Sequence, residues 1–304
     1  MTNVDSTPAR RTLAPVLGPA LPYLLHLRPA EWPILAAHLT VGWMMASGLR
    51  WPDGYALTGI AAWVLGLNGG TLALNSAFDR DDGDIAYLRA PPPPPKWLAH
   101  FGLALMVGGL LLTWSVGPVW RTIYGICLVL SIAYSVPPVR LKRIGGVDWM
   151  INVAGFGLLT PLAGWELSGR PLDAVALLVF IGFALLFGAL YPLTQLYQLD
   201  QDRARGDRNF ASLLGRRGSL AASLFLAGAA FGILGSAAWL SDWVVVPGLR
   251  WAAIGAAFMA WLAVLLPWRR QGSGWTSAEH QRGMYHALAA WALTDLAVLI
   301  AWVF

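Results

Sequence analysis

Long apolar stretches separated by short polar segments dominate the pattern along this chain. Nine of them reach or approach the ~20 residues that an α-helix needs to cross a membrane. They run over 33–49, 55–77, 97–115, 119–136, 149–166, 174–197, 218–240, 250–267 and 283–304. The pattern predicts an all-α fold, a multi-pass membrane bundle of about nine transmembrane helices within residues 33–304.

The basic residues test this count, because short cytoplasmic loops retain Lys and Arg. When the connecting segments are assigned alternately to two sides, 17 of the 21 basic residues fall on the side of the N-terminus. The other side has Arg50, Arg121, Arg170 and Arg250. The distribution predicts a multi-pass integral membrane protein with a cytoplasmic N-terminus, in the cell inner membrane if the source is bacterial.

Composition agrees with a chain surrounded by lipid. Of the 304 residues 57% are hydrophobic and 12% are charged, and the mean hydropathy is +0.57. The basic residues lie between apolar stretches rather than along one surface, so no nucleic acid partner is expected. The single cysteine, Cys127, excludes a disulfide framework and a cysteine-based metal site.

Residues 1–32 are expected to form a cytoplasmic or interfacial segment. Residues 12–32 contain several prolines and suit an interfacial helix better than a span. No cleaved signal peptide is expected, because the segment lacks an apolar core that ends in small residues. Further on, Pro91–Pro95 is a stiff polyproline spacer that leads the chain to the third helix.

Two acidic segments follow the second and the sixth predicted helix. Aligned at an offset of 123, each reads as an amide, three residues, Asp-Arg, two residues and Gly-Asp. The first acid element comprises Asn75, Asp79, Arg80, Gly83 and Asp84, and the second comprises Gln198, Asp202, Arg203, Gly206 and Asp207. The offset equals four helices, which predicts a parallel repeat with halves 33–146 and 147–267 and a last helix 283–304. Both elements fall on the cytoplasmic side.

The acid elements are candidate metal sites. A spacing of four places the amide and the first Asp of each element on one helix face. Hard oxygen ligands favour Mg²⁺, which is readily shared with substrate phosphates, so we expect a diphosphate held through Mg²⁺ between the two halves. The candidate ligands are Asn75, Asp79, Asp82, Asp84, Asp200, Asp202 and Asp207. Solvated loop acids are the alternative for one element, but the repeat disfavours it.

Further candidates have two interpretations each. Tyr134, Arg140 and Lys142 follow the fourth helix, where they either contact diphosphate oxygens or mark a helix end with cytoplasmic basic residues. His38 either reaches the cavity or packs in the bundle. Asp295, in the middle of the last helix, either acts in a proton relay or acceptor binding or makes a structural hydrogen bond to a neighbouring helix, and its distance from the acid elements favours the hydrogen bond.

These motifs resemble the UbiA-type intramembrane prenyltransferases over nearly the whole chain. The matching segments are Leu27-Arg28-Pro29 with Trp32, Asn75-x-x-x-Asp79, Tyr134-Ser135-x-Pro137-Pro138-x-Arg140-Leu141-Lys142, Asp200 with Asp202, and Gly206-Asp-Arg-Asn-Phe-Ala211. The resemblance implies nine helices around a central cavity, an Mg²⁺-bound isoprenyl diphosphate, and prenyl transfer to an aromatic or lipid acceptor. Together with their positions in the chain, these motifs make Asp79, Asp202, Lys142, Arg140 and Tyr134 the candidate catalytic residues. The candidate substrate-binding residues are Asn75, Gln198, Arg80, Arg203, Arg28 and His38.

The chain departs from the family pattern at Gly83, where an Asp is usual, and at Gln198, where an acid is usual. Asp79 and Asp202 are therefore the first choices as ligands. A membrane terpene cyclase of the same fold stays open as an alternative function, because it would ionise the same diphosphate without an acceptor. A transporter is the non-enzyme alternative, but the acids gather at one face rather than at mid-membrane.

Overall fold

The computed structural model describes residues 8–79, 85, 88, 90–114, 116–204, 206, 208–242 and 246–304. Among these residues the regular elements are helices, and the one pairing of extended backbone is an isolated bridge between Ile85 and Leu88. The predicted all-α class is confirmed.

Every predicted apolar stretch falls on a helical segment in the described part of the chain. Most helix ends lie within a few residues of the predicted ones, and the largest difference is at the start of the seventh. The segments are α3 (Trp32–Ser47), α4 to α5 through η3 (Gly54–Asp79), α6 (Leu98–Leu112), α7 (Pro118–Ser135), α8 to α9 through η5 (Val147–Glu166), α10 (Ala174–Leu193), α12 (Phe210–Leu240), α13 (Pro247–Gln271) and α14 (Ser277–Trp302).

Five of these segments are long and apolar enough to cross a membrane by length and composition. They are Gly54–Asp79, Ala174–Leu193, Phe210–Leu240, Pro247–Gln271 and Ser277–Trp302. The remaining ones are shorter or less apolar. The set is that of a multi-pass membrane bundle.

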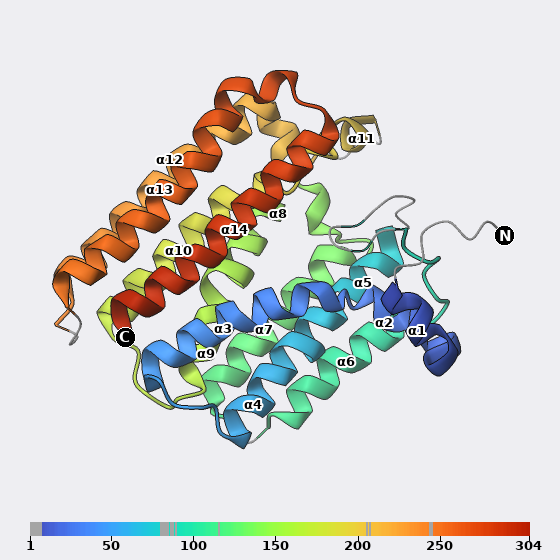
Figure 1. Ribbon diagram of the computed structural model, residues 1–304. Helices are drawn as coiled ribbons and strands as arrows, with labels where there is room; N and C mark the ends of the chain where they lie inside the picture. Colours follow the sequence, from blue (N-terminus) through green and yellow to red (C-terminus); the bar gives the residue numbers. More distant parts are fainter. Residues whose placement is uncertain are drawn as a thin grey trace. The chain divides into compact units, whose positions relative to one another are not determined.

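The helices pack as two units (Figure 1). The first unit consists of Met1–Ala36 and Pro52–Arg140, and the second of Ala37–Trp51 and Leu141–Phe304. Most of α3 therefore packs with the second unit although it begins in the first. The predicted halves 33–146 and 147–267 were defined by similar sequence, whereas these two units are defined by contacts between helices. The repeat therefore stays a prediction.

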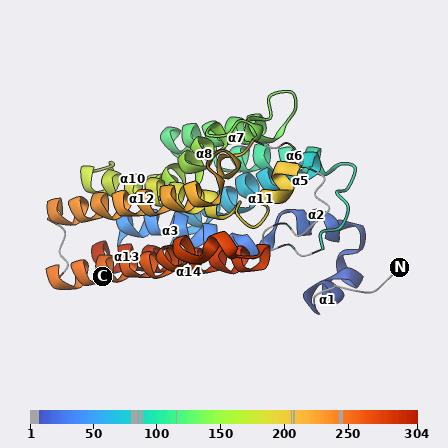
Figure 2. The same cartoon turned by 90° about the horizontal axis from the view of Figure 1, so that it is seen from above.

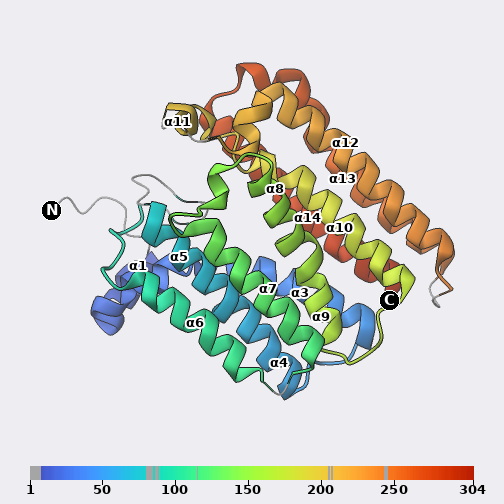
Figure 3. The ribbon, with the colours of Figure 1, turned by 180° about the vertical axis from the view of Figure 1, so that it is seen from behind.

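In the first unit, close packing fixes α5 (Gly70–Asp79) against its neighbours α6 and α7 (Figure 3). A Cβ on Gly102 would lie 2.7 Å from the carbonyl oxygen of Gly70, so α6 approaches α5 through two small residues. Thr71 Oγ1 donates to Ser131 Oγ of α7 at 2.9 Å. These contacts hold the helix that carries the first acid element.

In the second unit, α10 packs along α12, and α13 packs along α14 (Figure 2). Phe183 and Leu186 of α10 are fully buried, and Ser223 Oγ of α12 donates to the Ala189 carbonyl of α10 at 2.7 Å. α3 approaches α9 (Thr160–Glu166) so closely that a Cβ on Gly42 or Gly164 would overlap the opposing backbone. The second acid element begins at Gln198, after the turn that follows the end of α10 at Leu193.

The start of α12 differs from the prediction of 218. The helix begins at Phe210, where Asn209 Oδ1 accepts the Ser212 N–H at 2.9 Å as an N-cap. Gly215 then interrupts it with φ +68°, a conformation that glycine adopts without steric cost. The first turn is thus a separate helical piece that precedes the predicted span.

The N-terminal segment is a series of short helices rather than one. It consists of α1 (Pro8–Leu17), η1 (Gly18–Ala20), α2 (Leu21–His26) and η2 (Pro29–Glu31). Positive φ angles at Gly18 and Arg28 break the run. The predicted interfacial location stays a prediction.

Candidate active site

The first acid element begins in the last turn of α5. Asn75 and Asp79 lie there one turn apart, as their spacing of four predicts. Ser135 Oγ donates to Asn75 Oδ1 at 3.3 Å, and Arg140 Nη2 donates to Asp79 Oδ1 at 2.9 Å. The Asp79 and Arg140 side chains are 17% and 20% exposed. The ion pair is therefore close to the surface and able to meet a bound anion or cation.

The loop after α7 directs Arg140 toward Asp79. The chain passes through a cis peptide bond between Pro137 and Pro138, and Arg140 has φ +39°. Residues other than glycine rarely adopt this left-handed conformation, and such strain gathers at functional sites. The Arg140 N–H donates to the Val136 carbonyl at 3.0 Å, which closes the loop.

Tyr134 and Lys142 flank this loop. Tyr134 is half-buried in the last turn of α7. Lys142 is half-buried in η4 (Leu141–Arg143), where the second unit begins. Their contact with a diphosphate stays a prediction.

The second acid element has a different support. Leaving α10 at Leu193, the chain makes a turn and enters α11 (Leu199–Ala204). The Asp202 N–H donates to the Gln198 carbonyl at 2.9 Å, which places these two residues one helical turn apart. Asp202 is 8% exposed, and Asn209 Nδ2 donates to its Oδ2 at 2.7 Å. A neutral amide thus contacts this carboxylate, whereas a guanidinium contacts Asp79.

Asp200 lies on the same helix as Asp202 but has a different environment. Its side chain is 68% exposed and its Oδ2 accepts a hydrogen bond from Arg216 Nη2 of α12 at 2.7 Å. Its predicted role as a metal ligand is untested. Asp202 is the acid of this helix that is buried.

A buried carboxylate that the sequence did not single out organises the surroundings of the second acid element. Asp148 is fully buried at the start of α8 (Val147–Asn152). Its Oδ2 accepts hydrogen bonds from the Phe210 N–H at 3.0 Å, Gln195 Nε2 at 3.2 Å and the Tyr191 hydroxyl at 3.3 Å, and its Oδ1 accepts the Gly146 N–H at 2.9 Å. We call this group the Asp148 hub.

The hub joins α8, the end of α10 and the start of α12, the segments that precede and follow α11. Gln195 also accepts the Ala211 N–H through Oε1 at 3.0 Å. The available signal in the sequence was one acid that directly precedes the apolar stretch 149–166. Buried acids of this kind are rare unless paired or hydrogen-bonded.

His38 and Asp295 form a buried pair in the second unit. His38 Nδ1 lies 2.9 Å from Asp295 Oδ1, and the His38 ring packs edge-on against Phe183 and Trp291. The expected hydrogen bond of Asp295 to a neighbouring helix is present, with His38 of α3 as the partner. Substrate binding by His38 stays a prediction.

Arg28 is 8% exposed, and its Nη1 lies 3.6 Å from Glu31 Oε1. Burial raises the pKa of Glu31, while the Arg28 charge opposes this shift. The structure therefore places Arg28 in a local ion pair at the entrance to α3.

Several predicted residues lie outside the described part of the chain. They are Arg80, Asp82, Asp84 and Asp207, and of Arg203 the structure describes the backbone within α11 but not the side chain. Asp79 belongs to the first unit and Asp202 to the second. A joint grip of both acid elements on one ligand stays a prediction.

The donor atoms of the acid elements suit a hard divalent cation. Asp79 and Asp202 provide carboxylate oxygens, and Asn75 adds an amide oxygen. Within the described ranges, no group of three His, Cys, Asp or Glu side chains is placed to hold a metal. Carboxylate and amide oxygens of this kind fit Mg²⁺, a hard cation that usually keeps several waters and is shared with a ligand.

The described chain has apolar helices long enough to span a bilayer and an acid element in each of its two units, as expected of a multi-pass membrane protein with polar groups near its helix ends. The sequence model of the UbiA prenyltransferase family matches residues 32–289. The chain belongs to this family and is an integral membrane prenyltransferase. The resemblance noted in the sequence is confirmed.

Individual proteins similar to this chain are consistent with the family assignment. Over 225 residues the chain is 28% identical to the bacteriochlorophyll synthase 33 kDa chain of Cereibacter sphaeroides, covering 69% of this chain and 68% of that one. A structure concerned with digeranylgeranylglyceryl phosphate synthase aligns with a TM-score of 0.71 at 15% identity, over 93% of this chain and 98% of that chain. A UbiA homolog from Archaeoglobus fulgidus bound to GPP and Mg²⁺ aligns with a TM-score of 0.65 at 16% identity, over 90% and 99%. The structural matches establish the shared fold.

Proposed function

We propose that this chain transfers an isoprenyl group from an isoprenyl diphosphate, bound with Mg²⁺, to an aromatic or lipid acceptor in the membrane. The observation that carries the proposal is the Asp79–Arg140 pair, a carboxylate and a guanidinium 2.9 Å apart at the end of a membrane helix. This pair offers one group to a cation and one to an anion. The fold is shared with a protein whose structure was determined with bound GPP and Mg²⁺. This similarity supports an isoprenyl diphosphate and Mg²⁺ as the ligands proposed here.

Asp79 and Asp202 would hold Mg²⁺, assisted by Asn75 and by the acids that follow each of them. Bound Mg²⁺ would neutralise charge that develops on the leaving diphosphate. Arg140 orients Asp79 in the absence of ligand and donates hydrogen bonds to diphosphate oxygens in its presence. The further candidates for diphosphate contact are Lys142, Tyr134, Arg28, Arg80, Arg203, Gln198 and His38.

The reaction begins when the bond between C1 of the isoprenyl chain and the diphosphate oxygen breaks, with both electrons going to the diphosphate. The acceptor then forms the new bond at C1 and gives up a proton. Water must be excluded, since it would otherwise capture the allylic cation.

Aromatic side chains near the Asp148 hub are suited to this task. Phe187 of α10 stacks on Phe156 at 5.3 Å and on Tyr191 at 6.4 Å, and it meets Trp291 edge-on at 5.6 Å. Ring faces stabilise a nearby cation electrostatically. Because the Tyr191 hydroxyl donates to Asp148, this aromatic row starts at the Asp148 hub and continues one turn back along α10 to Phe187.

The acceptor is open between aromatic and lipid compounds. Similarity to a bacteriochlorophyll synthase favours a precursor of a photosynthetic pigment as the first acceptor to test. We place the acid elements and the N-terminus on the cytoplasmic side, because 17 of 21 basic residues fall there.

The test uses purified protein in nanodiscs with Mg²⁺, diphosphates from C10 to C20 and a panel of acceptors. Diphosphate release and prenylated product are measured separately. Asp79→Asn and Asp202→Asn should each reduce release at least 100-fold. Asp53→Asn and Asp173→Asn are matched controls, because both acids are helix N-caps and asparagine retains this function.

Each result has a defined meaning. Release and product that require Mg²⁺ and both acids support the proposal. Diphosphate release that yields a cyclised hydrocarbon and no prenylated acceptor would identify the protein as a terpene cyclase instead of a transferase. No release with any donor would refute it.

A further inference from the structure

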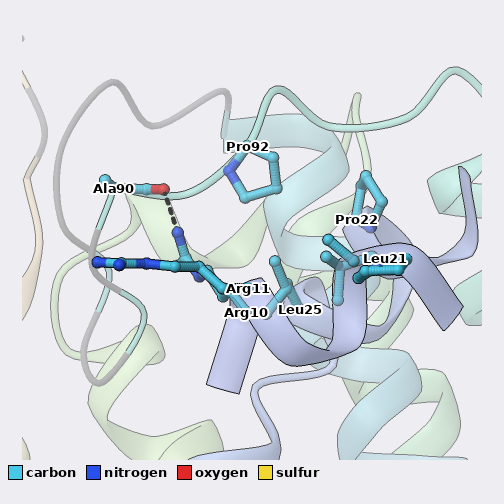
Figure 4. A pocket seen from close by; sticks show the side chains of 9 residues that line it. Arg10, Arg11, Leu21, Pro22, Leu25, Ala90 and Pro92 are labelled. Atoms are coloured by element: carbon cyan, nitrogen blue, oxygen red, sulfur yellow. Dashed lines mark hydrogen bonds between the residues drawn. The ribbon is translucent and has the colours of Figure 1, made fainter. Parts of the chain in front are cut away.

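A cavity of about 640 Å³ opens in the first unit between α1, α2 and the proline segment that precedes α6 (Figure 4). Arg10 and Arg11 of α1 line one part of it. The other walls are apolar and include Leu21, Pro22 and Leu25 of α2 and Pro92. The cavity therefore offers positive charge and hydrocarbon to the same ligand.

Two hydrogen bonds between distant parts of the sequence form this cavity. Arg10 Nη1 donates to the Ala90 carbonyl at 2.9 Å (Figure 4), and His26 Nε2 lies 3.0 Å from the Pro92 carbonyl. Because a carbonyl oxygen can accept but not donate, Nε2 carries the proton of this contact. Gly18 and Ala90 turn the chain with φ +47° and +43°. The N-terminal helices are thus fastened to the proline segment.

The chemistry of the lining identifies the class of ligand. Guanidinium groups recognise phosphate, and the apolar walls would contact hydrocarbon. A volume of about 640 Å³ lies within the ~300–1,000 Å³ of ligand cavities. It accommodates a headgroup and the first part of an acyl chain.

The surface of α1 indicates where such a ligand comes from. Leu13 and Val16 are 39% and 80% exposed, and Arg11 is exposed on the same short helix. Exposed apolar and basic residues on one helix are typical of attachment to the membrane interface. Anionic lipids of the cytoplasmic leaflet attract basic residues at this position.

We propose that this cavity binds the phosphate headgroup of an anionic glycerophospholipid, with Arg10 and Arg11 at the phosphate and the start of an acyl chain along Leu21 and Leu25. The bound lipid fastens α1 and α2 to the proline segment. Within the part of the chain that the structure describes, no residue of either acid element lines this cavity, and the proposal does not depend on the proposed reaction.

The experiment measures lipid retention by native mass spectrometry of the full chain released from nanodiscs of phosphatidylcholine with phosphatidylglycerol. The variants are Arg10→Gln/Arg11→Gln, and Arg11→Gln alone, which leaves the Arg10–Ala90 hydrogen bond intact. Arg269→Gln/Arg270→Gln is the matched control, since this exposed pair at the end of α13 carries the same charge. Ala14→Leu narrows the cavity without changing charge.

We expect the double variant to retain phosphatidylglycerol at least fivefold less than the wild type, and Arg11→Gln and Ala14→Leu to show part of this loss. The Arg269/Arg270 control should match the wild type. Equal loss in the control, or no loss in the double variant, would overturn the proposal. Displacement of the lipid by inorganic phosphate or by geranyl diphosphate at equal concentration would assign the cavity to a soluble phosphate instead.

Discussion

The two acid elements share one sequence pattern but are held in different ways. Asp79 lies in the last turn of a continuous membrane helix, and its partner is the Arg140 guanidinium. Asp202 lies in the separate short helix α11, is more buried, and is contacted by the Asn209 amide. Near it the buried Asp148 hub ties the flanking segments together. Among the described contacts, a guanidinium thus holds the carboxylate of the first element, while an amide holds that of the second and a buried network joins the segments on either side of it.

The largest expected effect comes from removing the hub. Asp148→Ala leaves four donors without their acceptor, and each unsatisfied buried group costs about 1–3 kcal/mol. We expect the free energy of unfolding to fall by about 3 kcal/mol or more and diphosphate release to be lost. Thermal unfolding in detergent and the release assay measure both. Asp53→Ala, which removes an N-cap worth about 1 kcal/mol, is the control, and equal destabilisation by the two would contradict the role of the hub.

A pair of variants compares the two partners directly. Arg140→Ala removes a cation beside the leaving diphosphate and should reduce the rate of release about 100-fold. Asn209→Ala removes one neutral hydrogen bond, worth about 0.5–1.5 kcal/mol, and should reduce it about tenfold. Arg140→Lys retains the charge and should recover part of the rate. Equal losses of release rate in Arg140→Ala and Asn209→Ala would contradict the expected difference between the charged partner of Asp79 and the neutral partner of Asp202.

Acid pH should affect the first unit through His26. Burial lowers the pKa of His26 from 6.5, the nearby Arg28 charge lowers it further, and the hydrogen bond to Pro92 opposes both. In the window just below pH 6.5 the unfolded segment binds more protons than the folded one. The contribution of His26 is therefore complete above pH 6.5 and is lost as the pH falls.

Hydrogen exchange of residues 21–26 between pH 7.5 and 5 measures this loss. His26→Gln can donate to Pro92 without titrating, so its exchange should depend less on pH. Equal pH dependence of the wild type and this variant would assign the effect to another group, with Glu31 the first to examine because burial raises its pKa.

The smallest effect on stability and on the rate of release is expected from the exposed ion pair between Arg216 and Asp200, which lies next to the second acid element. Arg216→Gln breaks the ion pair with Asp200, whose side chain is 68% exposed. Exposed pairs contribute about 0–1 kcal/mol, so the free energy of unfolding should change by less than about 0.5 kcal/mol and the rate of release by less than twofold. A loss comparable to that of Asn209→Ala would mean that Asp200 belongs to the active site.

The sequence predicted the helices well because apolar length is a local property. All nine apolar stretches coincide with helical segments, and the spacing within the first acid element matches the turn of α5. Contacts between distant residues were not predictable in the same way. Asp148 meets Phe210 across 62 positions and His38 meets Asp295 across 257. Which partners meet depends on packing, and no periodic pattern records it.

The separations of these contacts also impose an order on biosynthesis. The described contacts of the first acid element lie within residues 75–140, and the described contacts of the second element with those of the hub lie within 146–216. These ranges do not overlap, so the first is fully synthesised before the second emerges from the ribosome, because a chain is made from its N-terminus. The His38–Asp295 hydrogen bond is different. The earliest transmembrane helix must wait in the bilayer until the last one has been inserted before this bond can form.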